Sequence, residues 1–275
     1  MTSGNRDIGE QGKAMLDGKK IIGVIPSRIG STRLPRKALV DICGLPMILH
    51  VLIRARMSPV LDEVHVATDS EEIRAVVQAH GGHAIMTSPD HRTGIERIEE
   101  ATRDMDYDVV VLVNGDEAAL NPDHVEVSAR TLLASDAPTA LLASPSSRTG
   151  SPSDFKVVLN RFGEAMYFSR EDIPSPSRSG VTDFLKAYHI ISFRQGFLAE
   201  YVQLERTRLE AIEGHDHLRM LENGIKVQVG IVDHPSFSVD TPEDLEAMRQ
   251  AMRTDPIAAR YLPTPVGTSA RTAAR

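Results

Sequence analysis

The sequence predicts an α/β protein whose sheet is mostly parallel and covered by helices on both faces. Through the first two thirds of the chain, short apolar runs alternate with amphipathic helical patterns. Strands that alternate with helices are typical of parallel sheets with crossover helices. The 275 residues, of which 41% are hydrophobic, suffice for one large domain or two small ones.

The individual elements follow from the periodicity of the apolar residues. A short apolar run rich in β-branched residues indicates a strand, and apolar residues that recur on one helical face indicate a helix. In chain order, the sequence predicts a strand at 21–25, a helix at 47–57, a strand at 63–68, a helix at 71–80, a strand at 83–86, a helix at 94–103, a strand at 108–113, a helix at 123–135 and a strand at 139–143.

The composition changes after this alternating part. Residues 144–153 and 174–182 are rich in Ser, Pro and Gly and are predicted to be loops. Strands at 155–159, 165–168 and 187–193 are expected to form a second sheet, in a small β-rich insertion at about 150–205. Such an insertion often supplies a pocket or a dimer contact.

The C-terminal third is predicted to return to helices and one strand. Helices are expected at 202–213 and 216–222, and a strand at 226–232. A last helix begins near Asp240, with Thr241 as its N-cap and Pro242 at its first helical position.

Composition excludes several classes of protein. The net charge is -7, so a general nucleic-acid binder is not expected. One cysteine, Cys43, allows no disulfide framework, and no apolar stretch approaches the roughly 20 residues of a membrane span. We therefore expect a cytoplasmic protein with one domain at 19–255, a disordered N-terminal tail at 1–18 and a C-terminal tail at 256–275.

The loop after the first strand carries an unusual number of cations. Arg28, Arg33, Arg36 and Lys37 are separated by Gly30 and by small hydroxylated residues. Backbone N–H groups, hydroxyls and positive charges together suit a polyphosphate. The spacing matches neither a Walker loop nor Gly-x-Gly-x-x-Gly. The alternative is a solvated basic turn.

Two aspartates follow apolar runs far apart in the sequence. Asp116 comes just after the strand at 108–113, and Asp240 comes just after residues 236–239. Carboxylates at such positions are able to share one Mg²⁺, which prefers oxygen ligands. The alternatives are a helix N-cap role for Asp240 and a turn role for Asp116. Ligands of parallel sheets bind at the carboxyl ends of the strands, where the basic loop, Asp69 and residues 114–117 all fall.

Several motifs along the chain form one pattern. They are PSRIGSTRLPRKAL at 26–39, HVATD at 65–69, TSPDHRTG at 87–94, ER at 96–97, VNGDE at 113–117, KVV at 156–158, YFSR at 167–170, LRMLENG at 218–224 and VDTPEDL at 239–245. In these motifs the chain resembles the CMP-Kdo synthetases (3-deoxy-manno-octulosonate cytidylyltransferases). The resemblance extends over about residues 20–250 and implies a Rossmann-like nucleotidyltransferase fold, a homodimer, CTP as substrate and Mg²⁺ as cofactor.

The resemblance also implies roles for single residues. Arg28 and Lys37 would hold the triphosphate, Asp116 and Asp240 would hold the metal, and these four residues would be the catalytic set. The contacts to CTP would come from Pro26, Ser27, Arg28, Ser31, Thr32, Arg33, Lys37, Thr93, Gly94, Arg97 and Asn114.

The chain departs from the family pattern mainly where the acceptor would bind. Asn114 replaces a glutamine, Ile95 replaces a threonine, the segment 187–191 (AYHII) replaces His-Leu-Gly-Ile-Tyr, and Asp216-His217 replaces Glu-Gln. A site that has lost partners for substrate hydroxyls should recognise Kdo poorly. The acceptor site is therefore expected to be rewritten, with acceptor contacts from Arg170, His189, Asp216 and His217.

The acceptor that we expect from these departures is a small anion, in particular a phosphonate such as phosphonoformate. The alternative acceptor is Kdo or a related 3-deoxy sugar acid. In either case the acceptor would attack the α-phosphorus of CTP in line with departing pyrophosphate. Two further alternatives are a nucleotide-sugar glycosyltransferase and an inactive binding protein.

Overall fold

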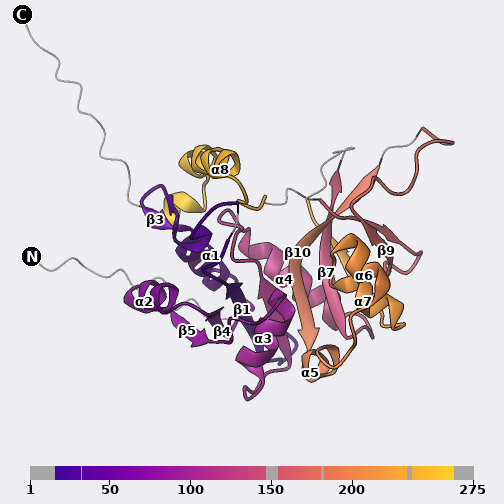
Figure 1. The fold of residues 1–275 in the computed structure, drawn as a ribbon, viewed down its shortest axis with the longest axis horizontal. Helices are drawn as coiled ribbons and strands as arrows, with labels where there is room; N and C mark the ends of the chain where they lie inside the picture. Colours follow the sequence, from indigo (N-terminus) through magenta and orange to yellow (C-terminus); the bar gives the residue numbers. More distant parts are fainter. Residues whose placement is uncertain (1–15, 32, 147–153, 181–182, 234–236, 263–275) are drawn as a thin grey trace, which may run out of the picture.

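The protein is organised around one nine-stranded sheet, seen in a computed structural model (Figure 1). The main path runs β11-β7-β10-β6-β1-β4-β5, β8 joins it by pairing with β10, and β9 pairs with β8. The structure describes residues 16–31, 33–146, 154–180, 183–233 and 237–262.

Most of the strands on the main path run parallel to one another. The first strand β1, Ile21–Ser27, pairs in parallel with β4 and with β6. Only β10 runs antiparallel, between β6 and β7. The parallel partners are β4 Glu63–Thr68, β5 His83–Met86, β6 Val109–Val113, β7 Thr139–Ser146 and β11 Val227–Ile231.

Helices cover both faces of the sheet, and the side chains of β1 alternate between them. Ile21 and Ile25 pack into the core beneath α1, α2 and α4, whereas Ile22 and Val24 pack into the core beneath α3, α5 and α7. A strand buried on both faces is fully apolar, which explains the uninterrupted run in the sequence. The helices of the first face are α1 Met47–Arg56, α2 Glu71–Ala79 and α4 Pro122–Leu133, and those of the second are α3 Gly94–Thr102, α5 Phe197–Tyr201 and α7 His217–Glu222.

The expected α/β class with a mostly parallel sheet and helices on both faces is confirmed. The expected second sheet is wrong, because the strand β10, Phe184–Arg194, inserts into the main sheet between β6 and β7. The strands β8, Lys156–Leu159, and β9, Ala165–Ser169, extend the same sheet through β10. Periodicity identifies a strand but not its neighbours, which explains the error.

Three further expectations need correction. The helix predicted at 202–213 is confined to α6, Arg208–Glu213, and the short helix α5 precedes it. The strand β7 continues to Ser146, into the predicted loop at 144–153, of which residues 147–153 lie outside the described residues. Residues 256–262 are packed rather than a tail, since the 3-10 helix Ala258–Arg260 begins with a fully buried alanine.

The last helix, α8, Pro242–Thr254, forms a third layer of packing. It lies next to α1 and to the hairpin of β2, Asp41–Ile42, and β3, Leu45–Pro46 (Figure 1). Thr241 and Asp244 form a capping box at its N-terminus, as the sequence predicted for the N-cap. The packing and the cap together fix the position of Asp240, which immediately precedes the helix.

A buried arginine joins α8 to the rest of the protein. The Arg54 guanidinium, which is 0% exposed, donates to Asp255 Oδ1 at 2.7 Å, to the Leu120 carbonyl at 3.1 Å and to the Tyr261 hydroxyl at 3.1 Å. His50 also contacts that hydroxyl, at 2.8 Å. These bonds connect α1, the segment after β6 and the C-terminal end of α8.

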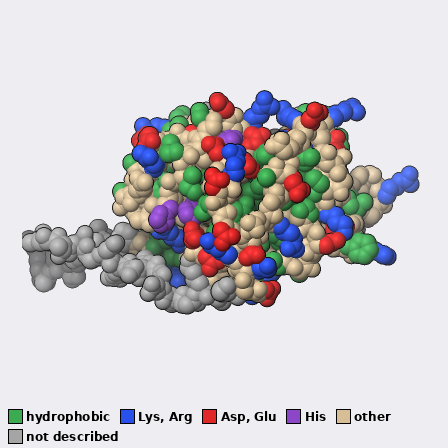
Figure 2. Space-filling model, turned by 90° about the horizontal axis from the view of Figure 1, so that it is seen from below, with side chains coloured by type: hydrophobic (Ala, Val, Ile, Leu, Met, Phe, Trp, Pro, Cys, Tyr) green, Lys and Arg blue, Asp and Glu red, His purple; other side chains and the backbone are tan. Residues whose placement is uncertain are grey.

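One face of the molecule shows how its charged side chains are distributed. Figure 2 shows a face on which Lys and Arg side chains are interspersed with Asp and Glu, rather than gathered into a broad positive patch. None of the helices in the described part of the chain has the length and apolar character that a membrane span requires.

The first prediction concerns Arg54. The Arg54→Met variant leaves Asp255 and a buried carbonyl without their partner, so the free energy of unfolding should fall by about 3 kcal/mol in urea denaturation. The matched control is Arg130→Met, because Arg130 is 58% exposed and pairs with Glu126 within one helix. The control should change stability by less than about 1 kcal/mol. Equal losses in the two variants would contradict the role assigned to Arg54.

Candidate active site

A cleft of about 370 Å³ opens at the carboxyl ends of β1 and β6. The two strands are neighbours in the sheet, so the loops that follow them face each other. Gly115 brings these loops into close contact, because a Cβ atom there would lie 2.9 Å from the Pro26 carbonyl oxygen. A glycine is therefore required for this approach.

The cleft gathers nearly all of the residues expected to bind nucleotide or metal. Thr32 lies outside the described residues. The predicted residues that line the cleft are Pro26, Ser27, Arg28, Ser31, Arg33, Lys37, Thr93, Gly94, Arg97, Asn114, Asp116 and Asp240. Further lining comes from residues that the sequence analysis did not assign, including Met47, His91 and Arg92.

Lys37 joins the two distant aspartates. Its ammonium lies 2.7 Å from Asp116 Oδ2 and 2.9 Å from Asp240 Oδ1. Arg33 lies 3.2 Å from the same Asp240 oxygen, and the Val239 amide donates to the Asp116 carbonyl at 3.0 Å. The sequence prediction that Asp116 and Asp240 converge near the basic loop agrees with this geometry.

The pKa values of these groups reflect that pairing. Burial alone would lower the pKa of Lys37, but the Asp116 and Asp240 carboxylates raise it above its ordinary value. Burial would likewise raise the pKa of Asp240, but Lys37 and Arg33 hold it below its usual range. The lysine is therefore an ammonium and Asp240 is a carboxylate at neutral pH.

The two aspartates fit a magnesium ion. Asp116 Oδ1 is buried and has no hydrogen-bond partner, so it is available to a ligand, and Mg²⁺ prefers such hard oxygen donors. No group of three or more His, Cys, Asp or Glu side chains suited to a metal occurs among the described residues. Mg²⁺ is ordinarily bound by one or two carboxylates, and substrate phosphates and waters complete its coordination shell.

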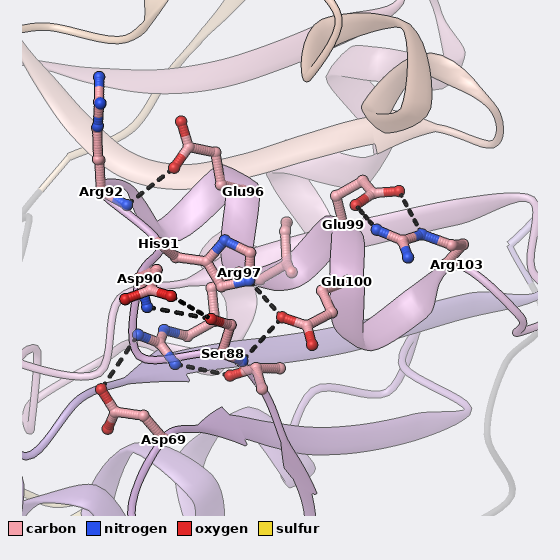
Figure 3. A network of polar contacts seen from close by, with 12 residues as sticks. Asp69, Ser88, Asp90, His91, Arg92, Glu96, Arg97, Glu99, Glu100 and Arg103 are labelled. Atoms are coloured by element: carbon pink, nitrogen blue, oxygen red, sulfur yellow. Dashed lines mark hydrogen bonds and ion pairs between the residues drawn. The ribbon is translucent and has the colours of Figure 1, made fainter.

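Asp69 supports the start of the basic loop. Its Oδ1 accepts the Ile29 amide at 3.2 Å, and its Oδ2 accepts from Arg97 at 3.3 Å. Arg97, which is nearly buried, also donates to the Thr87 hydroxyl at 2.6 Å (Figure 3). Asp69 thereby links Ile29, in the basic loop, to Arg97 in α3.

The N-terminus of α3 forms another wall of the cleft. Thr93 caps the helix by accepting the Glu96 amide at 3.2 Å, and the Arg92 amide donates to Glu96 at 2.8 Å. His91 contacts the Glu100 carboxylate, while the Arg92 side chain points away from this network (Figure 3). An N-terminal helix end with cations nearby favours an anionic ligand.

Glu117 is a functional candidate that the sequence analysis did not assign. This side chain is 2% exposed, and burial together with the Asp116 charge raises its pKa to about 8. A strongly shifted pKa beside an aspartate that lines the cleft marks Glu117 as a functional candidate.

The residues expected to bind the acceptor lie beyond Asp116, on the face of the sheet that α7 covers. His189 and His217 flank His215, with ring centroids 5.7 Å and 5.1 Å from it, and Phe155 stacks on His215 at 4.2 Å. The sequence analysis assigned the adjacent Asp216 and His217 to the acceptor site but missed His215, whose place in the cluster follows from tertiary packing.

Burial keeps these imidazoles uncharged. It lowers the pKa of His189, lowers that of His215 well below its ordinary value, and lowers that of His217 to about 3. Both ring nitrogens of His217 are buried without a hydrogen-bond partner. The cluster is therefore a neutral wall, which does not suit the compact dianion proposed from the sequence.

Arg170 and Asp216 lie beside this cluster. The Arg170 guanidinium lies 4.1 Å from the Phe155 ring centroid, and its Nε donates to the Glu213 carbonyl at 2.8 Å. Burial raises the pKa of Asp216 to about 6, and the nearby Thr93 opposes this rise. Asp216 therefore lies close to a residue of the nucleotide cleft.

The fold and the cleft define a nucleotidyltransferase, and comparisons with known proteins specify which kind. A family model described as "Cytidylyltransferase" matches residues 22–227. A 3-deoxy-manno-octulosonate cytidylyltransferase from Parabacteroides distasonis is 39% identical over 82% of this chain and 96% of its own length. The enzyme of that name from Escherichia coli is 39% identical over 85% of this chain and 96% of its own length.

A solved structure gives the same result. A CMP:2-keto-3-deoxy-manno-octonic acid synthetase complexed with CTP matches with a TM-score of 0.82 and 38% identity, over 85% of this chain and 98% of that one. A 4-diphosphocytidyl-2C-methyl-D-erythritol synthase from Anaerococcus prevotii, at 13% identity and a TM-score of 0.60, shares the fold alone. The chain belongs to the cytidylyltransferase family, in the group of the CMP-Kdo synthetases.

The second prediction concerns Asp69. The Asp69→Ala variant removes the acceptor for the Ile29 amide and the partner of Arg97, so CTP should bind about tenfold more weakly in calorimetry. Asp69→Asn keeps an oxygen for the amide and should lose less affinity. Wild-type affinity in the alanine variant would show that the loop does not depend on Asp69.

The third prediction concerns pH. The folded-state pKa of His217 lies below its unfolded value, so unfolding takes up protons in acid, and stability falls as the pH drops below about 6.5. The loss approaches about 1.4 kcal/mol per pH unit for each such histidine. Denaturation across this range should show a shallower loss in His217→Gln than in wild type.

The matched control for this pH series is His80→Gln. The His80 side chain is exposed, so its replacement takes no imidazole out of the interior. The same acid dependence in wild type and His217→Gln would contradict the burial of a neutral imidazole at this position.

Proposed function

We propose that the protein transfers CMP from CTP to a 3-deoxy sugar acid of the Kdo class and releases pyrophosphate. The observation that carries this proposal is the contact of Lys37 with both Asp116 and Asp240, inside a cleft that the basic loop also lines. Opposite charges placed this way suit a triphosphate bound with a divalent cation. The curated relatives carry this activity in their names.

The basic loop would bind the triphosphate. Arg28, Arg33 and Lys37 line the cleft, and the Ile29 amide beside them is oriented by Asp69. Guanidinium and ammonium groups neutralise phosphate oxygens, and a loop positioned in advance loses little entropy when it binds. These cations would stabilise the charge that develops on the departing pyrophosphate.

The wall formed by α3 and Asn114 would hold the cytidine. Thr93 and Gly94 lie at the start of α3, and Asn114 carries an amide able to donate and accept. Recognition of cytosine by this amide would contribute to the choice of nucleotide.

The reaction would proceed by in-line attack of an acceptor hydroxyl on the α-phosphorus. Asp116 and Asp240 would hold a magnesium ion, which lowers the pKa of a bound hydroxyl and neutralises phosphate charge. The protein's own part is to align the acceptor with the α-phosphate and to hold cations around the leaving group. No covalent intermediate with the protein is required.

The acceptor side favours the sugar acid over the phosphonate expected from the sequence. Three imidazoles that burial keeps neutral supply hydrogen-bond donors and acceptors rather than positive charge. Neutral groups beside Phe155 suit hydroxyls and the apolar face of a sugar ring. The similar proteins named above are 3-deoxy-manno-octulosonate cytidylyltransferases, and neither name mentions a phosphonate acceptor.

The homodimer implied by the resemblance also remains a proposal. Phe162 and Met166 are 64% and 62% exposed and place apolar surface at and beside β9, where a second copy could pack.

Two competing functions are disfavoured. A glycosyltransferase is disfavoured because the cleft carries more cations than a diphosphate leaving group needs. An inactive protein is disfavoured because the charged contacts of Lys37 are complete.

The fourth prediction is the acceptor assay. With CTP and Mg²⁺, Kdo should give sustained pyrophosphate release, and phosphonoformate should give none above background. Asp116→Asn should reduce the rate at least about 100-fold, because it removes a ligand of the metal and a charge from the reaction centre. Turnover with the phosphonate and none with Kdo would overturn the sugar-acid proposal while leaving cytidylyl transfer intact.

A further inference from the structure

Lys37 takes the place between the aspartates that a divalent cation would need. Its single ammonium contacts Asp116 Oδ2 at 2.7 Å and Asp240 Oδ1 at 2.9 Å, and the side chain is only 19% exposed. The ammonium therefore stands in for a metal ion. An ion that binds these oxygens must move the ammonium first.

The charges around Lys37 balance one another without any ligand. Asp116 and Asp240 contribute two negative charges, and Lys37 and Arg33 contribute two positive ones in direct contact with them. A divalent cation that enters alone is repelled by both side chains and by Arg28 in the same cleft. A triphosphate that enters alone is repelled by the two carboxylates.

Resting on the proposed function, we propose that Lys37 closes the metal site until a nucleoside triphosphate arrives. The ammonium then leaves the carboxylates for the phosphate oxygens, and the divalent cation takes its place. No charged group is left unpaired, because each exchanges one partner of opposite charge for another. Lys37 is thus a binding determinant for the metal as well as for the nucleotide.

The position of Lys37 in the chain suits such a movement. It begins the short 3-10 helix Lys37–Leu39, whose backbone is fixed by packing of Ala38 into the core. A lysine carries its charge on a flexible four-carbon stem, so the ammonium reorients while the backbone stays in place. The unpartnered Asp116 Oδ1 supplies a further oxygen for the arriving ion.

The proposal makes metal and nucleotide binding interdependent. Each ligand relieves the repulsion that the other would meet, so each must raise the affinity of the other by the same factor. Free divalent cations should therefore bind weakly to the protein without nucleotide, although two carboxylates lie ready.

The fifth prediction tests this with Mn²⁺ alone, followed by electron paramagnetic resonance of the unbound ion. The full-length protein is used without nucleotide or acceptor. Lys37→Met should bind Mn²⁺ roughly tenfold more tightly than wild type or better, because the competing ammonium is gone. Added Mn²⁺ should accordingly raise the melting temperature of this variant more than that of wild type.

Two further variants keep the test specific. Arg36→Met removes the neighbouring positive charge, whose guanidinium contacts Glu72 rather than the aspartates, and should leave Mn²⁺ affinity at the wild-type value. Lys37→Gln removes the charge with a polar side chain of similar reach, and it should match Lys37→Met. If Lys37→Met fails to fold, Lys37→Gln provides the same test.

The result that overturns the proposal is an Mn²⁺ affinity that stays at the wild-type value in both Lys37 variants. An equal gain in Arg36→Met also overturns it, since the effect would then be one of net charge. Because no acceptor or CTP is present, this outcome is independent of the acceptor assay. A protein that fails to use Kdo would still show the tighter Mn²⁺ binding.

Discussion

The whole site depends on opposite charges held together at one edge of the sheet. Lys37, Asp116 and Asp240 come from three distant parts of the chain: the 3-10 helix Lys37–Leu39, the loop after β6 and the segment before α8. Adjacent parallel strands β1 and β6 bring the first two loops together, and the Val239 amide ties the third segment to the Asp116 carbonyl. The fold thereby keeps two like-charged carboxylates close by means of the cations between them.

Polar groups around the cleft keep these half-buried charges in position. Arg54 anchors the far end of α8, and the capping box at Thr241 fixes the near end beside Asp240. Asp69 and Arg97 do the same for the basic loop. Such groups lose little when a ligand binds, because they are already satisfied within the protein. The cost of ordering the site is therefore met mainly during folding.

The sequence predicted well where the strands end, but it predicted less well how the strands pair in the sheet. Strong apolar runs such as β6 identify strands, and polar residues just after them identify the ligand edge. Periodicity could not reveal that β10 enters the main sheet, because a strand's partners depend on distant segments. The buried His215 and the link between Arg54 and Asp255 arise only from tertiary packing. The neutral state of His217 likewise depends on burial, which the sequence alone does not reveal.

The most direct test of the account is a crystal structure of the protein with CTP and Mn²⁺, with the ion located by its anomalous signal. The account predicts an ion bound to Asp116 and Asp240, with the Lys37 ammonium moved from those carboxylates to the triphosphate. An ion found elsewhere, or a lysine still seated between the aspartates with CTP bound, would contradict it.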